Sequence, residues 1–329
     1  MPRVTWGRLR PLVGLGIIGV LLWRLGGRAF LDGLRVIDAR GVCAALAIGL
    51  GTTVFSAWRW CLVARRLGLR LPLGAGVADY YRALFLNAVL PAGVLGDVHR
   101  AVRHGRREGD VGRGVRAVAL ERAAGQVVVI GMAVPLLLAR PAEIPARFRD
   151  ATSIFAVLAV LVVLIALVAV AAGLAARGGR SASRWRRGCA VALVDLRRGL
   201  LARDVWPGVV LLSGLTFAGH LALFLAAARA AGATAPAGRL LPLLALTLLA
   251  MALPVNVGGW GPREGMAALA FGAAGLGAAQ GLTTAVVYGV LAFIASLPGA
   301  VLLLRPEVVV RRRPVRHHPH RTAVVVPQR

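Results

Sequence analysis

Residues 90–100 read LPAGVLGDVHR, and residues 253–263 read LPVNVGGWGPR. Both stretches fit the pattern L-P-x4-G-x3-R, and their matched positions are separated by 163 residues, about half of the chain. Each stretch places a proline, glycines and an arginine at the end of an apolar run, which predicts a break in a helix. Backbone polar groups freed by such a break cannot face lipid and must line a protein-walled or watery cavity. Because paired broken segments are typical of transporters, the repeat predicts a membrane protein with a binding cavity between its halves.

The composition excludes an ordinary soluble domain. The chain has 329 residues, of which 58% are hydrophobic, and its mean hydropathy is +0.74. Residues 151–176, 205–228 and 281–304 contain no charged side chain, and each stretch exceeds the ~20 apolar residues that cross a bilayer as a helix. We therefore predict an all-α polytopic membrane protein with about six to eight transmembrane helices.

The apolar segments divide into broken and continuous ones. Residues 73–96 and 240–277 contain the repeated stretches and are predicted to be broken or re-entrant. Residues 1–304 are expected to form one membrane domain, and residues 305–329 a basic cytoplasmic tail. The continuous segments are predicted as spans at residues 11–31, 41–63, 118–139, 151–176, 205–228 and 281–304.

The formal net charge of +27 comes from 40 arginines without any lysine. These arginines lie mostly in short loops between apolar spans, which membrane topology explains better than nucleic-acid binding, so no nucleic-acid partner is expected. With the N-terminus in the cytoplasm, the segments predicted inside carry 27 arginines and those predicted outside carry 9. This bias predicts a multi-pass protein of the bacterial inner membrane with both termini in the cytoplasm.

The same orientation constrains the broken segments. Both flanks of residues 73–96 are basic and should lie inside, so this segment should enter the membrane and return. Residues 240–277 begin outside and either return outward or cross twice with a break. We favour the first alternative, in which the two segments are re-entrant hairpins of opposite sense and the chain is an inverted repeat.

Charged residues within the apolar segments are the candidate site. A charge in a membrane span costs at least ~2.5 kcal/mol on insertion scales, so it usually faces a cavity or a partner. Arg59, Arg82 and Asp79 are of this kind. Six further residues lie beside the breaks or open a span, and we predict that they form an intramembrane polar cluster: Asp97, Arg100, Glu121, Arg122, Arg263 and Glu264.

Two signatures in the chain resemble those of a known family. Residues 85–100, FLNAVLPAGVLGDVHR, are followed by LERAAG at residues 120–125. This resembles the pattern F-x-N-x-x-L-P-G-G-x-G-G-D-x-x-R and then D/E-R-x-x-G of the flippase-like membrane family, typified by the transmembrane region of lysylphosphatidylglycerol synthases. Ala92 and Leu95 stand where the family often has glycine, so the first break should be stiffer than the pattern. The second signature, P-x-x-x-G-G-x-G-x-R-E, is matched by Pro254, Gly258, Gly259, Gly261, Arg263 and Glu264.

The resemblance implies a membrane domain that moves lipid-linked molecules between leaflets. The two-domain members of the family carry a soluble aminoacyltransferase after the membrane part. Here the longest polar segments are residues 177–204 and 305–329, which are shorter than the ~50 residues of a small domain. Aminoacyl transfer is therefore not expected, and transport is favoured over an enzymatic function. The expected partners are membrane lipids, either an anionic phospholipid or a polyprenyl-phosphate-linked substrate.

The residue types leave alternatives open. Arg100, Arg122 and Arg263 either bind a lipid phosphate or pair with the neighbouring acids to hold the bundle together. Asn87 either caps broken backbone, which we favour, or contacts a headgroup. His220 is expected to be a neutral histidine bonded across helices rather than a proton relay. The structural breakers are expected to permit turns and close packing, and they are Pro91, Gly93, Gly96, Pro254, Gly258, Gly259 and Gly261.

Two further functions compete with transport. A membrane enzyme acting on a lipid-linked substrate would use Asp97, Glu121 or Glu264 as acid or base, but the chain offers no clear nucleophile. Alternatively, the protein is an accessory subunit that partners an envelope-lipid enzyme. The three cysteines have no ligand spacing and no phosphate-binding loop is visible, so neither a metal nor a cofactor is expected.

Overall fold

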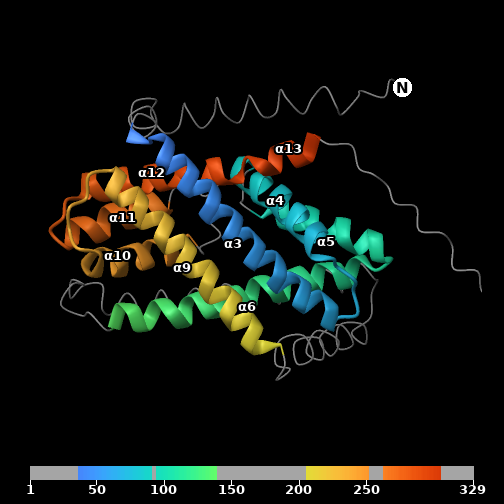
Figure 1. Cartoon of the computed structure of the whole chain (residues 1–329). Coiled ribbons are helices and arrows are strands. Elements are labelled where there is room, and N and C mark those ends of the chain that lie inside the picture. Colours follow the sequence, from blue (N-terminus) through green and yellow to red (C-terminus); the bar gives the residue numbers. More distant parts are fainter. Residues whose placement is uncertain (1–35, 91–93, 139–204, 252–261, 305–329) are drawn as a thin grey trace, which may run out of the picture.

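A computed structural model describes residues 36–90, 94–138, 205–251 and 262–304 (Figure 1). Within these ranges every regular element is a helix, so the all-α prediction is confirmed. The bounds are α3 Ala39–Arg66, α4 Leu73–Val89, α5 Leu95–Glu108, α6 Val111–Leu138, α9 Trp206–Ala230, α10 Ala237–Ala250, α11 Pro262–Ala273, α12 Ala278–Ser296 and α13 Pro298–Leu304.

Four stretches of the described residues are long and apolar enough to cross a membrane. They are α3, Val111–Leu137 of α6, α9, and Ala278–Leu304, which comprises α12 and α13. These correspond to the spans predicted at residues 41–63, 118–139, 205–228 and 281–304. The spans predicted at residues 11–31 and 151–176 lie outside the described residues. The architecture is that of an all-α polytopic membrane protein.

Each predicted broken segment contains two helices that pack together. Residues 73–96 hold α4 and the start of α5, and residues 240–277 hold most of α10 and all of α11. Figure 1 shows the α4–α5 pair toward one end of the bundle and the α10–α11 pair toward the other. The breaks themselves, at residues 91–93 and 252–261, lie outside the described residues, and with them Pro91, Gly93, Pro254, Gly258, Gly259 and Gly261.

Gly96 permits the close packing of α4 and α5. A Cβ atom at Gly96 would lie 2.1 Å from the carbonyl oxygen of Ala83, so only glycine allows the two backbones to approach this closely. This agrees with the packing role predicted for the glycine, whose backbone is helical at the start of α5.

Gly105, Gly109 and Gly114 shape the turn from α5 into α6. α5 ends at Gly109, whose φ of 79° is left-handed, and α6 starts two residues later. A Cβ at Gly114 would lie 2.7 Å from the Cα of Gly105, so these two glycines permit α5 and α6 to cross closely. The segment is therefore a tight helical corner.

Two apolar clusters form the core on either side of a polar region. One joins α9, α10, α11 and α12 to the second half of α6 and to Ala45 of α3, with Phe224 and Tyr288 stacked at 4.2 Å between ring centroids. The other surrounds the fully buried Trp60 and joins the second half of α3 to α4, α5, the first half of α6 and Val209 of α9. Because α3, α6 and α9 contribute to both clusters, the polar region between them lies near the middle of these spans.

Candidate functional site

Glu121 is the centre of a buried charged cluster. Its Oε1 atom accepts a hydrogen bond from Nε of Arg59 at 3.0 Å, and its Oε2 atom accepts one from Nη2 of Arg100 at 2.7 Å. The Tyr80 hydroxyl also donates to Oε1, at 3.4 Å. Glu121 and Arg100 have no exposed surface, and Arg59 is 5% exposed. Burial of these charges is tolerated because each one meets an opposite charge at hydrogen-bonding distance.

Asp97 extends the cluster to the first break. Its Oδ1 atom accepts from Nε of Arg100 at 2.8 Å, and its Oδ2 atom accepts from Nη2 of Arg122 at 2.6 Å. Asp97 lies in the first turn of α5, next to the first break. Each of its two carboxylate oxygens thus meets one guanidinium group, which balances the negative charge of the side chain.

Asn87 joins the two helices of the first broken segment. Its Oδ1 atom accepts from the backbone N–H of Gly96 at 2.7 Å, and its Nδ2 group donates to Oδ2 of Asp97 at 3.1 Å. The N–H of Gly96 belongs to the first turn of α5, where the helix itself offers no acceptor. Asn87 thus caps the helix that follows the break, which is the role favoured from the sequence.

Aromatic rings surround the Arg100 guanidinium. Its Cζ atom lies 4.4 Å from the ring centroid of Tyr80 and 4.7 Å from that of Trp60. Rings at these distances attract a cation through their quadrupoles, most strongly where water is absent. The arginine is therefore held by two carboxylates and two rings, which fixes the position of α5 against α3, α4 and α6.

A cavity of about 260 Å³ lies beside the cluster. Arg59 and Arg122 line it, and the Arg122 side chain remains 46% accessible. Both broken segments contribute to its wall, the first through Tyr80 of α4 and the second through Leu248 of α10 and Met251, which follows it. The other lining residues are Thr52, Thr53, Ser56, Leu84, Gly125, Gln126, Val129, Ser213, Thr216, Phe217, His220 and Tyr288.

The cluster beside this cavity carries a surplus of positive charge. It contains three guanidinium groups, those of Arg59, Arg100 and Arg122, and two carboxylates, those of Asp97 and Glu121. One positive charge is therefore not balanced within the cluster. A buried surplus of this kind attracts an anion into the adjacent cavity.

Residues 9–299 match the family described as the lysylphosphatidylglycerol synthase TM region. The chain belongs to this family. The resemblance drawn from the two signatures is thereby confirmed, and the family is one of membrane proteins connected with lipid metabolism or transport. No curated protein and no solved structure matched the chain.

The charged cluster joins the two parts of the first family signature. Residues 85–100 supply Asn87, Asp97 and Arg100, and residues 120–125 supply Glu121 and Arg122. Arg100 and Arg122 therefore form ion pairs, which is one of the two roles considered for them. Arg122 also lines the cavity, so that the second role, contact with a phosphate, stays open for this residue.

The second family signature forms a separate pair. Nε of Arg263 donates to Oε1 of Glu264 at 2.8 Å, in the first turn of α11. The Arg263 guanidinium lies 5.4 Å from the ring centroid of Tyr288, whose hydroxyl is 3.1 Å from Nδ1 of His220. The structure therefore divides the predicted six-residue cluster into two groups, and Tyr288 and His220 connect the second group to the cavity. His220 contacts another helix, as expected from the sequence.

Several residues of the cavity were missed from the sequence. Arg59 was recognised as a charge within a span but was not assigned to the site. The hydroxyl residues Thr52, Ser56, Ser213 and Thr216 were not noticed, although they interrupt the apolar stretches of α3 and α9 near mid-length. Polar residues three or four positions apart within a span share one helix face, and that spacing was the available signal.

Proposed function

We propose that this protein moves an anionic lipid or a lipid-linked precursor between the leaflets and holds its phosphate in the cavity described above. The observation that carries the proposal is the composition of the cavity wall. It joins residues of both broken segments to the guanidinium groups of Arg59 and Arg122. Guanidinium groups bind phosphate oxygens through paired charge-assisted hydrogen bonds.

Charge balance supports a single phosphate as the ligand. The cluster has one positive charge more than it has carboxylates, and a phosphodiester carries one negative charge. A bound phosphodiester would thus neutralise the site without breaking the ion pairs of Glu121. The Ser213 hydroxyl, which accepts a hydrogen bond from Nη1 of Arg59, keeps its own proton for a further hydrogen bond to the headgroup.

The position of the cavity supports movement across the membrane. Its residues on α3, α6 and α9 lie near the middle of spanning helices, so that a ligand there would be close to the bilayer midplane. The α4–α5 and α10–α11 pairs lie at opposite ends of the bundle (Figure 1), as re-entrant hairpins of an inverted repeat would. We infer that the two halves rock about the cavity and open it to each leaflet in turn.

The size of the cavity favours binding of a headgroup alone. Pockets that enclose a whole drug-sized ligand have volumes of about 300–1,000 Å³, and the cavity is somewhat smaller. A phosphate with a small substituent fits this space, whereas acyl or polyprenyl chains do not. The hydrocarbon would therefore remain in the surrounding lipid while the headgroup crosses.

The state of the acidic residues favours transport over catalysis. Asp97 and Glu121 each pair with two arginines. A general acid or base must exchange its proton in each turnover, and two guanidinium groups hold each of these carboxylates in its ionised form. Glu264 is likewise paired, with Arg263.

A leaflet-exchange assay tests the proposal. The full-length protein would be reconstituted into vesicles that contain fluorescent phosphatidylglycerol, and a membrane-impermeant reductant would report the lipid that reaches the outer leaflet. Arg122→Gln should slow exchange by about tenfold or more, the factor expected for loss of a charged contact of ~1.4 kcal/mol. Arg122→Lys should retain part of the activity, since it keeps the charge and loses the guanidinium fork.

Arg113→Gln is the matched control. Arg113 lies on the same helix, pairs with Asp110 at 3.4 Å and is 44% exposed, so its loss removes the same charge away from the cavity. Elution and melting behaviour of each variant would show that it folds. Equal exchange rates for wild-type protein, Arg122→Gln and Arg113→Gln would rule out the proposed site.

A further inference from the structure

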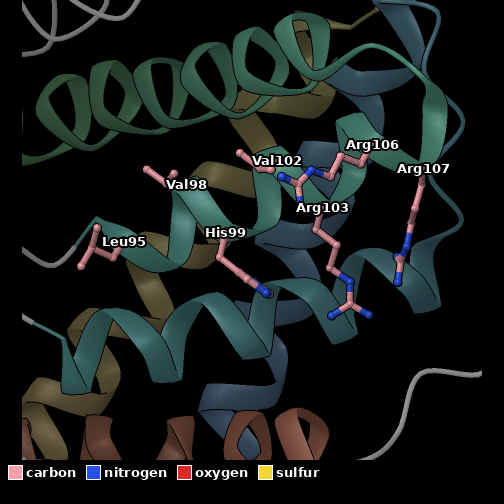
Figure 2. Close-up of a pocket in the computed structure, with 7 residues that line it drawn as sticks. All are labelled: Leu95, Val98, His99, Val102, Arg103, Arg106 and Arg107. Atoms are coloured by element: carbon pink, nitrogen blue, oxygen red, sulfur yellow. The ribbon is translucent and has the colours of Figure 1, made fainter. Parts of the chain in front are cut away.

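α5 has an inner and an outer face of different character. Its inner face carries Asp97 and the fully buried Arg100 of the charged cluster. On its outer face Leu95 and Val98 are 43% and 53% exposed. Figure 2 shows this outer face, along which lies an open groove of about 660 Å³. The groove is lined by Leu95, Val98, His99, Val102, Arg103, Arg106 and Arg107.

The groove changes from apolar to basic along the helix. The spacing of Leu95, Val98, Val102 and Arg106 places these residues in one stripe. In Figure 2 the guanidinium group of Arg106 lies back along the helix toward Val102. Arg103 and Arg107 follow at the same end, where they lie 3.3 and 3.1 Å from the buried carboxylate of Asp79.

The length of the stripe matches one leaflet. From Leu95 to Arg106 a helix rises ~16 Å, and half of a hydrocarbon core is ~15 Å thick. With Arg106 at the level of the lipid phosphates, Leu95 would lie near the midplane. Exposed valine and leucine side chains suit acyl chains, and arginines at the end of the stripe suit headgroup phosphates.

The charge of the groove selects its occupant. The chain segments outside the described residues, 1–35, 139–204 and 305–329, each carry more arginines than acidic residues. A second copy of this chain, with its net charge of +27, would also be repelled. The complementary partner is therefore anionic and has an apolar portion long enough to cover Val98 and Leu95.

We propose that the outer face of α5 binds one anionic phospholipid, with the phosphate beside Arg106 and an acyl chain along Val102, Val98 and Leu95. This site is separate from the central cavity, because α5 lies between the groove and the cluster of Asp97 and Arg100. Binding at this site does not require that the protein transports lipid. If the protein does transport lipid, the bound molecule would lie against α5, the helix that covers one side of the charged cluster.

Lipid binding by the purified full-length protein in detergent tests the site. Fluorescence anisotropy would compare labelled phosphatidylglycerol with labelled phosphatidylcholine. Arg106→Gln should weaken binding of phosphatidylglycerol about fivefold, the effect of one arginine near an anionic headgroup, and should leave phosphatidylcholine binding nearly unchanged. Val98→Asn should weaken binding of both lipids, since it changes the acyl contact.

The control again is Arg113→Gln, which removes one exposed arginine from a helix that does not line the groove. Equal weakening by Arg106→Gln and Arg113→Gln would show unspecific attraction to a basic surface and overturn the proposal. Soluble glycerophosphoglycerol has the headgroup but no acyl chain. If it displaced the labelled lipid at the same concentration as the whole lipid does, the site would bind a phosphate without an acyl contact, which contradicts the proposal. A changed oligomeric state of Val98→Asn with unchanged lipid binding would assign the face to a contact between copies.

Failure here is distinguishable from failure of the proposed transport. Arg122 does not line the groove and Arg106 does not line the cavity. Loss of lipid exchange in Arg122→Gln, with lipid binding unaltered in Arg106→Gln, would support the cavity alone. Weakened lipid binding in Arg106→Gln with unaltered exchange would support the α5 site alone.

Discussion

Arg100 donates through Nη2 to Oε2 of Glu121 at 2.7 Å, and neither side chain has any exposed surface. Arg100 lies on α5 just after the first break, and Glu121 lies within the α6 span. This ion pair joins the two parts of the first family signature, residues 85–100 and 120–125. The signature is therefore split in the sequence because its parts come from two helices that meet at one buried contact.

We expect Glu121→Gln to destabilise the protein strongly. The substitution removes the negative charge shared by Arg59 and Arg100, and leaves both guanidinium groups buried without it. Breaking a buried ion pair from one side costs about 3–5 kcal/mol. Melting of the purified protein, followed by size-exclusion chromatography after heating, measures the effect.

Glu108→Gln serves as the comparison for Glu121→Gln. Glu108 is partly exposed at the end of α5 and accepts a hydrogen bond from the backbone of Arg70 at 3.3 Å. Its substitution should change the free energy of unfolding by less than about 1 kcal/mol. Similar melting temperatures for the two variants would contradict the central position that we assign to Glu121.

Gly96→Ala should separate α4 from α5. The new methyl group would lie 2.1 Å from the carbonyl oxygen of Ala83, and backbone cannot yield as a flexible side chain can. We expect a loss of about 1–3 kcal/mol, the usual cost of overpacking. The matched variant is Gly74→Ala on α4, where a Cβ meets nothing within 4 Å. It should melt no lower than the wild type, because alanine is the better helix former. Equal melting of both variants would contradict the close packing.

Asn87→Asp should be more harmful than Asn87→Ala. The aspartate keeps an acceptor for the N–H of Gly96, but it replaces an amide donor by a charge about 3 Å from Oδ2 of Asp97. Thermal melting of the two single variants shows which substitution lowers the melting temperature more. The double variant Asn87→Asp with Asp97→Asn should recover part of the loss, because the repulsion is then removed. Absence of any recovery would mean that Asn87 does not act through Asp97.

The sequence was sufficient for the spans and for the family. Uncharged stretches longer than ~20 residues have few alternatives to a membrane helix, because unpaired backbone groups are not tolerated in lipid. The spans at residues 205–228 and 281–304 were therefore predictable from composition alone, and those at 41–63 and 118–139 were predictable although they contain Arg59, Glu121 and Arg122. The repeated breaker pattern located the two helical pairs for the same reason, since prolines and glycines disrupt helices locally.

The sequence did not show which charges meet. Arg263 occupies the position of Arg100 in the repeat. Arg100 pairs with Glu121 on another helix, whereas Arg263 pairs with its neighbour Glu264 and lies 5.4 Å from the ring centroid of Tyr288. The sequence also did not show that Gly105 and Gly114 permit α5 and α6 to cross closely, because glycine occurs both in weak helices and at close helix crossings. Only the distance between the two backbones distinguishes these roles.

What the residues determined by themselves was local: where helices span, where they break and which charges cannot face lipid. What the tertiary structure decided was the wall of the cavity, to which α3, α4, α6, α9, α10 and α12 contribute residues far apart in the chain. Ion pairs and cavities depend on distances of a few ångströms between helices. Those distances are set by the packing of whole helix faces, and no short stretch of sequence specifies them.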